Sequence, residues 1–146
     1  MTHTYPCDYA SLARQVDALL SGEPDALANT SNFVALLFNA LEGINWLGVY
    51  VLRQEDLVLG PFQGNPACVR IALGSGVCGT AASEQRTLLV DDVNTFEGHI
   101  VCDPDSRSEI VVPLISGDRL LGVLDIDSPH EGRFGASDQA GLEQLC

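Results

Sequence analysis

Apolar positions recur at helical spacing in the first part of the chain and in strand-like runs after it. Residues 8–20 carry a leucine and valine stripe that ends at Ser21-Gly22, and residues 27–41 repeat the pattern. Because apolar residues three and four positions apart share one helix face, two N-terminal helices are predicted. After Gly43 the runs are rich in β-branched and aromatic residues, which predicts strands over residues 44–52, 57–62 and 68–73.

The second half predicts short elements around one long polar segment. Small residues over 77–84 favour a helix packed close to a sheet, and residues 88–90 favour a strand. Residues 91–108 lack periodicity and predict a long loop, which inside a compact domain is usually functional or disordered. The last predicted elements are a hairpin of two apolar runs and a closing helix with Ser137 as its N-cap, over residues 109–115, 119–126 and 137–145.

Helices and strands that do not strictly alternate favour an α+β fold, with a mostly antiparallel central sheet flanked by N-terminal and C-terminal helices. A length of 146 residues is typical of one domain. We therefore expect a single domain over residues 1–146. Its N-terminal helices occupy residues 1–42, and the sheet, long loop, hairpin and closing helix occupy residues 43–146.

Three acidic residues lie on the predicted hairpin. A turn symmetric about Gly117 places Glu109 opposite Asp125, and a bulge would shift this pairing by one residue. Asp125 and Asp127 are two apart on one strand, so their side chains share a face. Crowded carboxylates cannot all stay ionised without a raised pKa or a cation, so the cluster indicates a bound amine, a metal or a shared proton. The alternative is that these are strand-end residues on a solvated edge.

The charge balance limits the classes of molecule that this chain is expected to bind. Twenty acidic residues face seven arginines and no lysine, for a net charge of −13. This field disfavours nucleic acid and anionic membrane surfaces, but leaves a cationic or zwitterionic partner open. No apolar run approaches the roughly 18 residues of a membrane span. The chain has five cysteines and lacks the apolar segment of a signal peptide, so we expect a cytoplasmic location and thiols that act as core residues, metal ligands or redox groups.

Three cysteines lie away from the termini. Cys102 is in the predicted long loop, where a thiol is accessible, and is either a reactive group or an inert thiol. Cys68 begins a predicted strand and Cys78 lies in the small helix, positions typical of core residues. Their spacing contains no Cys-x-x-Cys, which disfavours a structural zinc site and a thioredoxin-type motif.

Other motifs are less specific. Gly74-x-Gly76-x-x-Gly79 matches the dinucleotide fingerprint by letter, but no acidic residue follows at the end of a second parallel strand. There is no Gly-x-Ser-x-Gly motif to indicate a serine hydrolase. Trp46 and Tyr50 lie four apart on one predicted strand and share a face, either in the core or as the wall of a pocket.

Six sequence blocks in the same order resemble the free methionine-(R)-sulfoxide reductases, single-domain enzymes with the GAF fold. The resemblance covers roughly residues 30 to 145. The blocks are Asn45-Trp46-Leu47-Gly48-Val49-Tyr50, Leu59-Gly60-Pro61-Phe62-Gln63-Gly64, residues 74–82, His99-Ile100-Val101-Cys102-Asp103, residues 106–114 and Gly122-Val123-Leu124-Asp125-Ile126-Asp127-Ser128.

The resemblance implies a role for each matched position. Cys102 matches the family's nucleophile, Cys68 its resolving cysteine, and Cys78 a third cysteine able to join an alternative disulfide. Glu109, Asp125 and Asp127 match the carboxylates that hold the amino group and polarised sulfoxide of free methionine-R-sulfoxide. Trp46 and Tyr50 match the aromatic wall around its methyl end. The implied chemistry passes through a cysteine sulfenic acid and a disulfide, which external thioredoxin reduces, without a metal or organic cofactor.

The amino-acid sequence is also compatible with two other functions. A GAF module can sense a small ligand without chemistry, although such modules usually precede an output domain for which this length leaves no room. A thiol peroxidase would use peroxide as its oxidant. Members of the resembled family commonly extend further in the last helix, so we expect a short closing helix or one replaced by a partner subunit in a homodimer.

Overall fold

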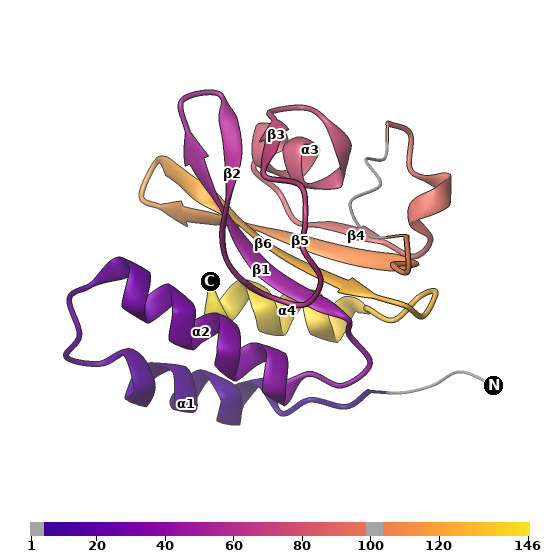
Figure 1. The fold of residues 1–146 in the computed structure, drawn as a ribbon. Coiled ribbons are helices and arrows are strands. Elements are labelled where there is room, and N and C mark those ends of the chain that lie inside the picture. Colours follow the sequence, from indigo (N-terminus) through magenta and orange to yellow (C-terminus); the bar gives the residue numbers. More distant parts are fainter. Residues whose placement is uncertain (1–4, 99–103) are drawn as a thin grey trace.

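The computed structural model describes residues 5–98 and 104–146 (Figure 1). These residues form four α-helices, a short 3₁₀ helix and six strands. In chain order the elements are α1 (Tyr9–Leu20), α2 (Ala26–Ala40), β1 (Trp46–Arg53), β2 (Asp56–Gln63), β3 (Arg70–Ala72), α3 (Gly76–Glu84), β4 (Leu88–Val90), η1 (Val93–Thr95), β5 (Ser108–Ser116), β6 (Arg119–Ser128) and α4 (Ala136–Leu145).

The six strands form one sheet in the order β3-β2-β1-β6-β5-β4. All pairings described between these strands are antiparallel, which confirms the predicted α+β class. The hairpin between β5 and β6 lies beside β1, so the centre of the sheet joins segments far apart in the sequence. No helix formed by the described residues has the length and apolar character needed to cross a membrane.

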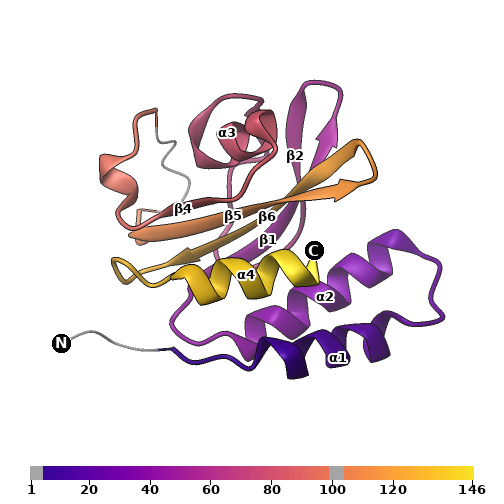
Figure 2. The same ribbon diagram turned by 180° about the vertical axis from the view of Figure 1, so that it is seen from behind.

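The two faces of the sheet carry separate apolar clusters. Figures 1 and 2 show α1, α2 and α4 on one side of the sheet and α3 on the other. Leu47 and Val49 pack toward the three helices, whereas Trp46 and Tyr50 belong to the cluster beside α3. This alternation follows from the two-residue period of a strand, because successive side chains point to opposite faces. The α3 face also carries the acidic residues of the predicted site.

The closing helix begins differently from the prediction. Its N-cap is Gly135, so the prediction of Ser137 at that position was wrong. The Asp138 carboxylate accepts a hydrogen bond from the Gly135 N–H at 2.9 Å and another from the Tyr9 hydroxyl at 2.6 Å. Asp138 also forms a buried ion pair with Arg133 at 3.4 Å. An acidic residue at the positive end of the helix therefore replaces the expected serine cap.

Candidate functional site

The three acidic residues lie side by side on β5 and β6. Glu109 is paired with Asp127, and Asp125 is paired with Val111, so the predicted pairing of Glu109 with Asp125 was wrong. Ser116 pairs with Arg119 across a two-residue turn, and an irregularity at Leu114/Ile115 shifts the register by one more residue. Because this total shift is two residues, the three carboxylates keep the same face.

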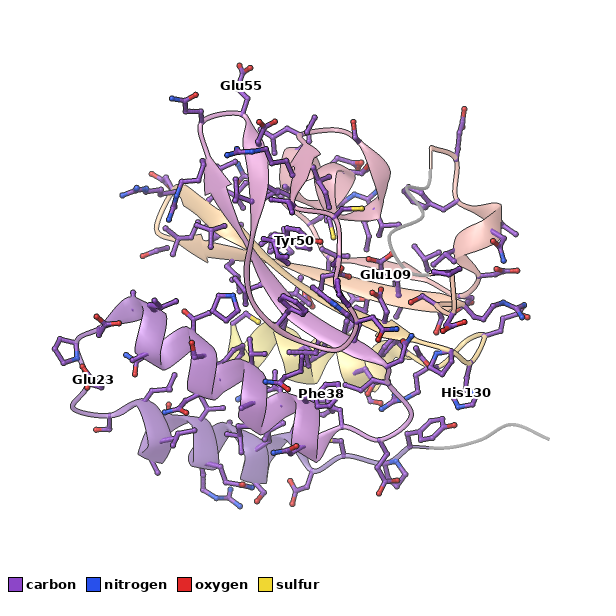
Figure 3. The ribbon with its side chains drawn as sticks, in the orientation of Figure 1. Glu23, Phe38, Tyr50, Glu55, Glu109 and His130 are labelled. Carbon is purple, nitrogen blue, oxygen red and sulfur yellow. The ribbon has the colours of Figure 1, made fainter. Side chains whose placement is uncertain are left out.

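This acidic group is largely inaccessible to solvent. Glu109 is 7% exposed and Asp125 is 6% exposed, while Asp127 is half-buried. Figure 3 shows Glu109 and Tyr50 on the α3 side of the sheet. The alternative of a solvated strand edge is therefore wrong for Glu109 and Asp125. Burial of neighbouring carboxylates requires compensation by a proton or a cation.

Burial and the neighbouring charges favour a proton on this cluster. The pKa of Glu109 is raised well above its ordinary value, mainly by burial and to a lesser extent by the nearby charges of Asp125 and Asp127. The Cys78 thiol donates to Glu109 Oε2 at 3.8 Å, and burial together with the same carboxylates raises its pKa. A carboxyl group of raised pKa can serve as a proton donor near neutral pH.

The same residues form a set of potential metal ligands. One ligand atom from each of Cys78, Glu109 and Asp125 lies within 4.8 Å of the others. Among the described residues this is the set that could hold a metal ion. The arrangement equally suits an ammonium group, because two buried carboxylates and the adjacent Asp127 can accept its hydrogen bonds.

An aromatic wall adjoins the carboxylates. Trp46 is paired with Asp127 between β1 and β6, and its ring is stacked on Phe62 with centroids 5.4 Å apart. Tyr50 lies further along β1, with its ring 6.0 Å from that of Trp46. A Cβ added at Gly48 would lie 2.5 Å from both Trp46 and Phe62, so glycine is needed between the rings. Strand alternation thus confirms the shared face of Trp46 and Tyr50.

Sequence reasoning did not single out Phe62 as part of this wall. Phe62 lies within the sequence block that ends at Gly64, but it reaches the wall because it pairs with Gly48 on β1. The residues of that block do not reveal this strand register. The apolar character of residues 57–62 was the only signal for it.

The polar edges of the wall point to the segment before β3. Trp46 Nε1 donates to the Asn65 carbonyl at 3.0 Å, and the Tyr50 hydroxyl donates to the Cys68 carbonyl at 2.9 Å. Cys68 lies just before β3 rather than inside the predicted strand, and it is disulfide-bonded. This segment therefore brings one predicted redox cysteine to the aromatic wall.

The other cysteines differ in their surroundings. Cys78 is a buried free thiol beside Glu109, as expected for the small helix α3. Cys7 and Cys146 are also free thiols. Cys102, the predicted nucleophile, lies outside the described residues.

Comparisons with known proteins identify the family of this chain. The GAF domain family matches residues 3–146. The free methionine-R-sulfoxide reductase of Escherichia coli strain K12 is 52% identical over 137 residues, covering 94% of this chain and 83% of the relative. The chain belongs to the free methionine-R-sulfoxide reductase family of GAF domains.

Solved structures of the reductase family share the fold over nearly the whole chain. The reduced form of fRMsr of Staphylococcus aureus is 51% identical with a TM-score of 0.95, covering 99% of this chain and 94% of that chain. The free methionine-R-sulfoxide reductase from Neisseria meningitidis, solved in complex with its substrate, is 41% identical with a TM-score of 0.91, covering 99% and 90%. The GAF fold predicted for this reductase-family chain is therefore confirmed.

Proposed function

We propose that this chain reduces free methionine-R-sulfoxide to methionine by thiol chemistry. The observation that carries the proposal is the buried pair Glu109 and Asp125, next to Asp127 and to the stacked rings of β1 and β2. A zwitterionic amino acid with an apolar methyl end and a basic sulfoxide oxygen matches these two surfaces. Close relatives that carry the name of this activity support the same conclusion.

The carboxylates would divide two tasks in substrate binding. Ionised carboxylates accept hydrogen bonds from the substrate ammonium, which compensates their charge in a site with little water. The proton held by the cluster faces the sulfoxide oxygen, and its raised pKa keeps it available near neutral pH. Glu109 is the best candidate for this acid, because it is buried and lies opposite Asp127. Trp46 and Tyr50 would enclose the methyl end.

Reduction would transfer the sulfoxide oxygen to Cys102. Its thiolate attacks the sulfoxide sulfur while the acid protonates the oxygen. The net result is cleavage of the substrate's S–O bond and formation of an S–O bond on the cysteine. The sulfoxide gains two electrons and becomes methionine, while the Cys102 sulfur loses two electrons and becomes a sulfenic acid. No metal or organic cofactor is needed for this balance.

A second thiol would then regenerate the enzyme. Cys68 attacks the sulfenic sulfur, which forms a disulfide and releases water, and an external dithiol of the thioredoxin class reduces that disulfide. Cys68 is disulfide-bonded, whereas Cys7, Cys78 and Cys146 are free thiols, and this difference supports the assignment. Cys78 would be an alternative partner, since its thiol lies at the carboxylates.

A panel of three sulfoxides tests this proposal. With a dithiol as reductant, the chain should release methionine from free methionine-R-sulfoxide but not from the S epimer. N-acetyl-methionine-R-sulfoxide should react roughly 100-fold more slowly, because acetylation removes the charge that the carboxylates bind. A chain that binds methionine sulfoxide without releasing methionine would be a sensor. A chain that oxidises its thiols only with peroxide would be a peroxidase, and either result would refute the proposal.

A further inference from the structure

The segment that carries Cys68 is attached to β1 through two side chains that are otherwise candidates for substrate binding. Trp46 Nε1 donates to the carbonyl of Asn65 at 3.0 Å, three residues before Cys68. The Tyr50 hydroxyl donates to the carbonyl of Cys68 itself at 2.9 Å. Trp46 is 2% exposed and Tyr50 is 1% exposed, so both donors are fixed by the core. Donors from rigid elements define the position of a backbone that has no strand partner of its own.

Backbone packing reinforces these two bonds. Gly64 has a φ of +130°, and a Cβ added there would lie 2.6 Å from Trp46 Cδ1 and 2.8 Å from the Asn45 carbonyl oxygen. The chain can therefore approach the indole only because residue 64 is glycine. On the other side of Cys68, the Leu59 N–H donates to the Val69 carbonyl at 2.9 Å. Cys68 is thus held between anchors on both sides.

The chemical role of the Tyr50 hydroxyl is restricted to that of a donor. Burial, followed by the nearby Asp125, raises its pKa, so the hydroxyl stays protonated. Its neighbour Trp46 Nε1 has a donor and no acceptor. Both groups therefore suit backbone carbonyls, while the two rings stack on each other and Trp46 also stacks on Phe62. The two functions use different parts of each side chain.

We propose that the Tyr50 hydroxyl, supported by the Trp46 indole, is a positioning group for the recycling step. It holds the Cys68 backbone where the Cys68 thiol reaches the oxidised cysteine. In that step the Cys68 sulfur bonds to the sulfenic sulfur, the S–OH bond breaks, and the thiol proton leaves with the hydroxide as water. This inference rests on the proposed function, since it assigns these residues to its second half-reaction.

Tyr50→Phe is the substitution that tests the proposal, because it keeps the ring and removes only the hydroxyl. The fully reduced enzyme is mixed with one equivalent of methionine-R-sulfoxide without a reductant, and methionine and free thiols are followed in time. Methionine release in the same mixture is the reference rate, because the Tyr50 ring is also a candidate for substrate binding. Disulfide formation should slow by roughly two- to tenfold more than methionine release does, the effect of one net hydrogen bond, and dimedone should trap more sulfenic acid.

Two controls separate positioning from general damage. Tyr9→Phe removes another partly buried tyrosine hydrogen bond, to Asp138 at 2.6 Å on the opposite side of the sheet, and should leave disulfide formation unchanged. In a Cys68→Ser background, adding Tyr50→Phe should not change the lifetime of the sulfenic acid. Trp46→Phe should slow disulfide formation in the same direction as Tyr50→Phe.

Three outcomes would overturn the inference. The first is disulfide formation at the wild-type rate in Tyr50→Phe. The second is a slowing of methionine release in Tyr50→Phe equal to that of disulfide formation. The third is a sulfenic acid lifetime that Tyr50→Phe changes in the Cys68→Ser background. A second readout needs no sulfoxide: the equilibrium constant for oxidising Cys68 against dithiothreitol should fall two- to tenfold in Tyr50→Phe. If the wild type releases no methionine, the proposed function fails. This equilibrium then decides the positioning role by itself, a fall supporting it and no change refuting it.

Discussion

Replacing Glu109 by Gln tests whether the carboxylate cluster holds a proton. Glu109 is 7% exposed and lies opposite Asp127, and its pKa in the folded state is raised well above its ordinary value of 4.5. Between those two pKa values the folded protein binds more protons than the unfolded chain. The free energy of unfolding contributed by this group is therefore highest below about pH 4.5, and it decreases as the pH rises through that window.

The size of this effect follows from proton linkage. One proton bound in the folded state and absent from the unfolded state changes the free energy of unfolding by about 1.4 kcal/mol per pH unit. Glutamine has a similar shape and does not ionise. The stability of Glu109→Gln relative to the wild type should therefore rise by up to about 1.4 kcal/mol per pH unit above pH 4.5. Reduction of methionine sulfoxide should fall by roughly 10²- to 10⁴-fold, the usual contribution of a general acid.

Urea unfolding measured at several pH values, with the fluorescence of the single tryptophan as the probe, gives the required slopes. Glu55→Gln is a matched control, since Glu55 is exposed in the turn between β1 and β2 and projects away from the sheet (Figure 3). Its stability should follow the wild-type pH dependence. Parallel curves for Glu109→Gln and the wild type, together with an unchanged reaction rate, would refute the assignment of a protonated acid.

Four further substitutions test the redox cysteines and the packing of the fold. Cys102→Ser should abolish methionine release even in one turnover, whereas Cys68→Ser should release about one methionine per chain and then turn over slowly; equal turnover by Cys102→Ser and the wild type would contradict this. Gly48→Ala should cost about 1–3 kcal/mol of stability, because its Cβ would lie 2.5 Å from Trp46 Cη2 and from Phe62 Cβ, and an unchanged melting temperature would argue against that packing. Arg133→Ala should cost about 3–5 kcal/mol by leaving Asp138 buried without its ion pair, as chemical denaturation would measure. A loss below about 1 kcal/mol would show that this pair is dispensable.

Most elements of the fold follow from local periodicity. The stripe over residues 8–20 buries one helix face, and the hairpin consists of two apolar runs that are buried on both faces over part of their length. The pattern therefore identifies α1, β5 and β6 within one or two residues. The register of the hairpin cannot be predicted from periodicity, because it depends on the turn length and on the irregularity at Leu114/Ile115. The residue types at that irregularity do not indicate it. The register differs by two residues from the predicted one, so Glu109 is paired with Asp127 instead of Asp125. All three side chains still point to the same side of the sheet.

The candidate site was predictable to a similar degree. Spacing alone placed Asp125 with Asp127 and Trp46 with Tyr50, since residues separated by an even number share a strand face. It could not show where the indole N–H and the tyrosine hydroxyl point. Their acceptors, Asn65 and Cys68, lie in a segment without periodicity, and only the folded chain brings that segment against β1.

In the proposed mechanism, methionine formation and thiol oxidation are two parts of one reaction. Fully reduced protein is mixed with a small excess of free methionine-R-sulfoxide. Methionine is then quantified, remaining thiols are counted, and the disulfide is mapped by mass spectrometry after alkylation. We predict one methionine per chain, the loss of two thiols, and a disulfide between Cys68 and Cys102. Methionine release with every thiol retained, or thiol loss without methionine, would contradict the account.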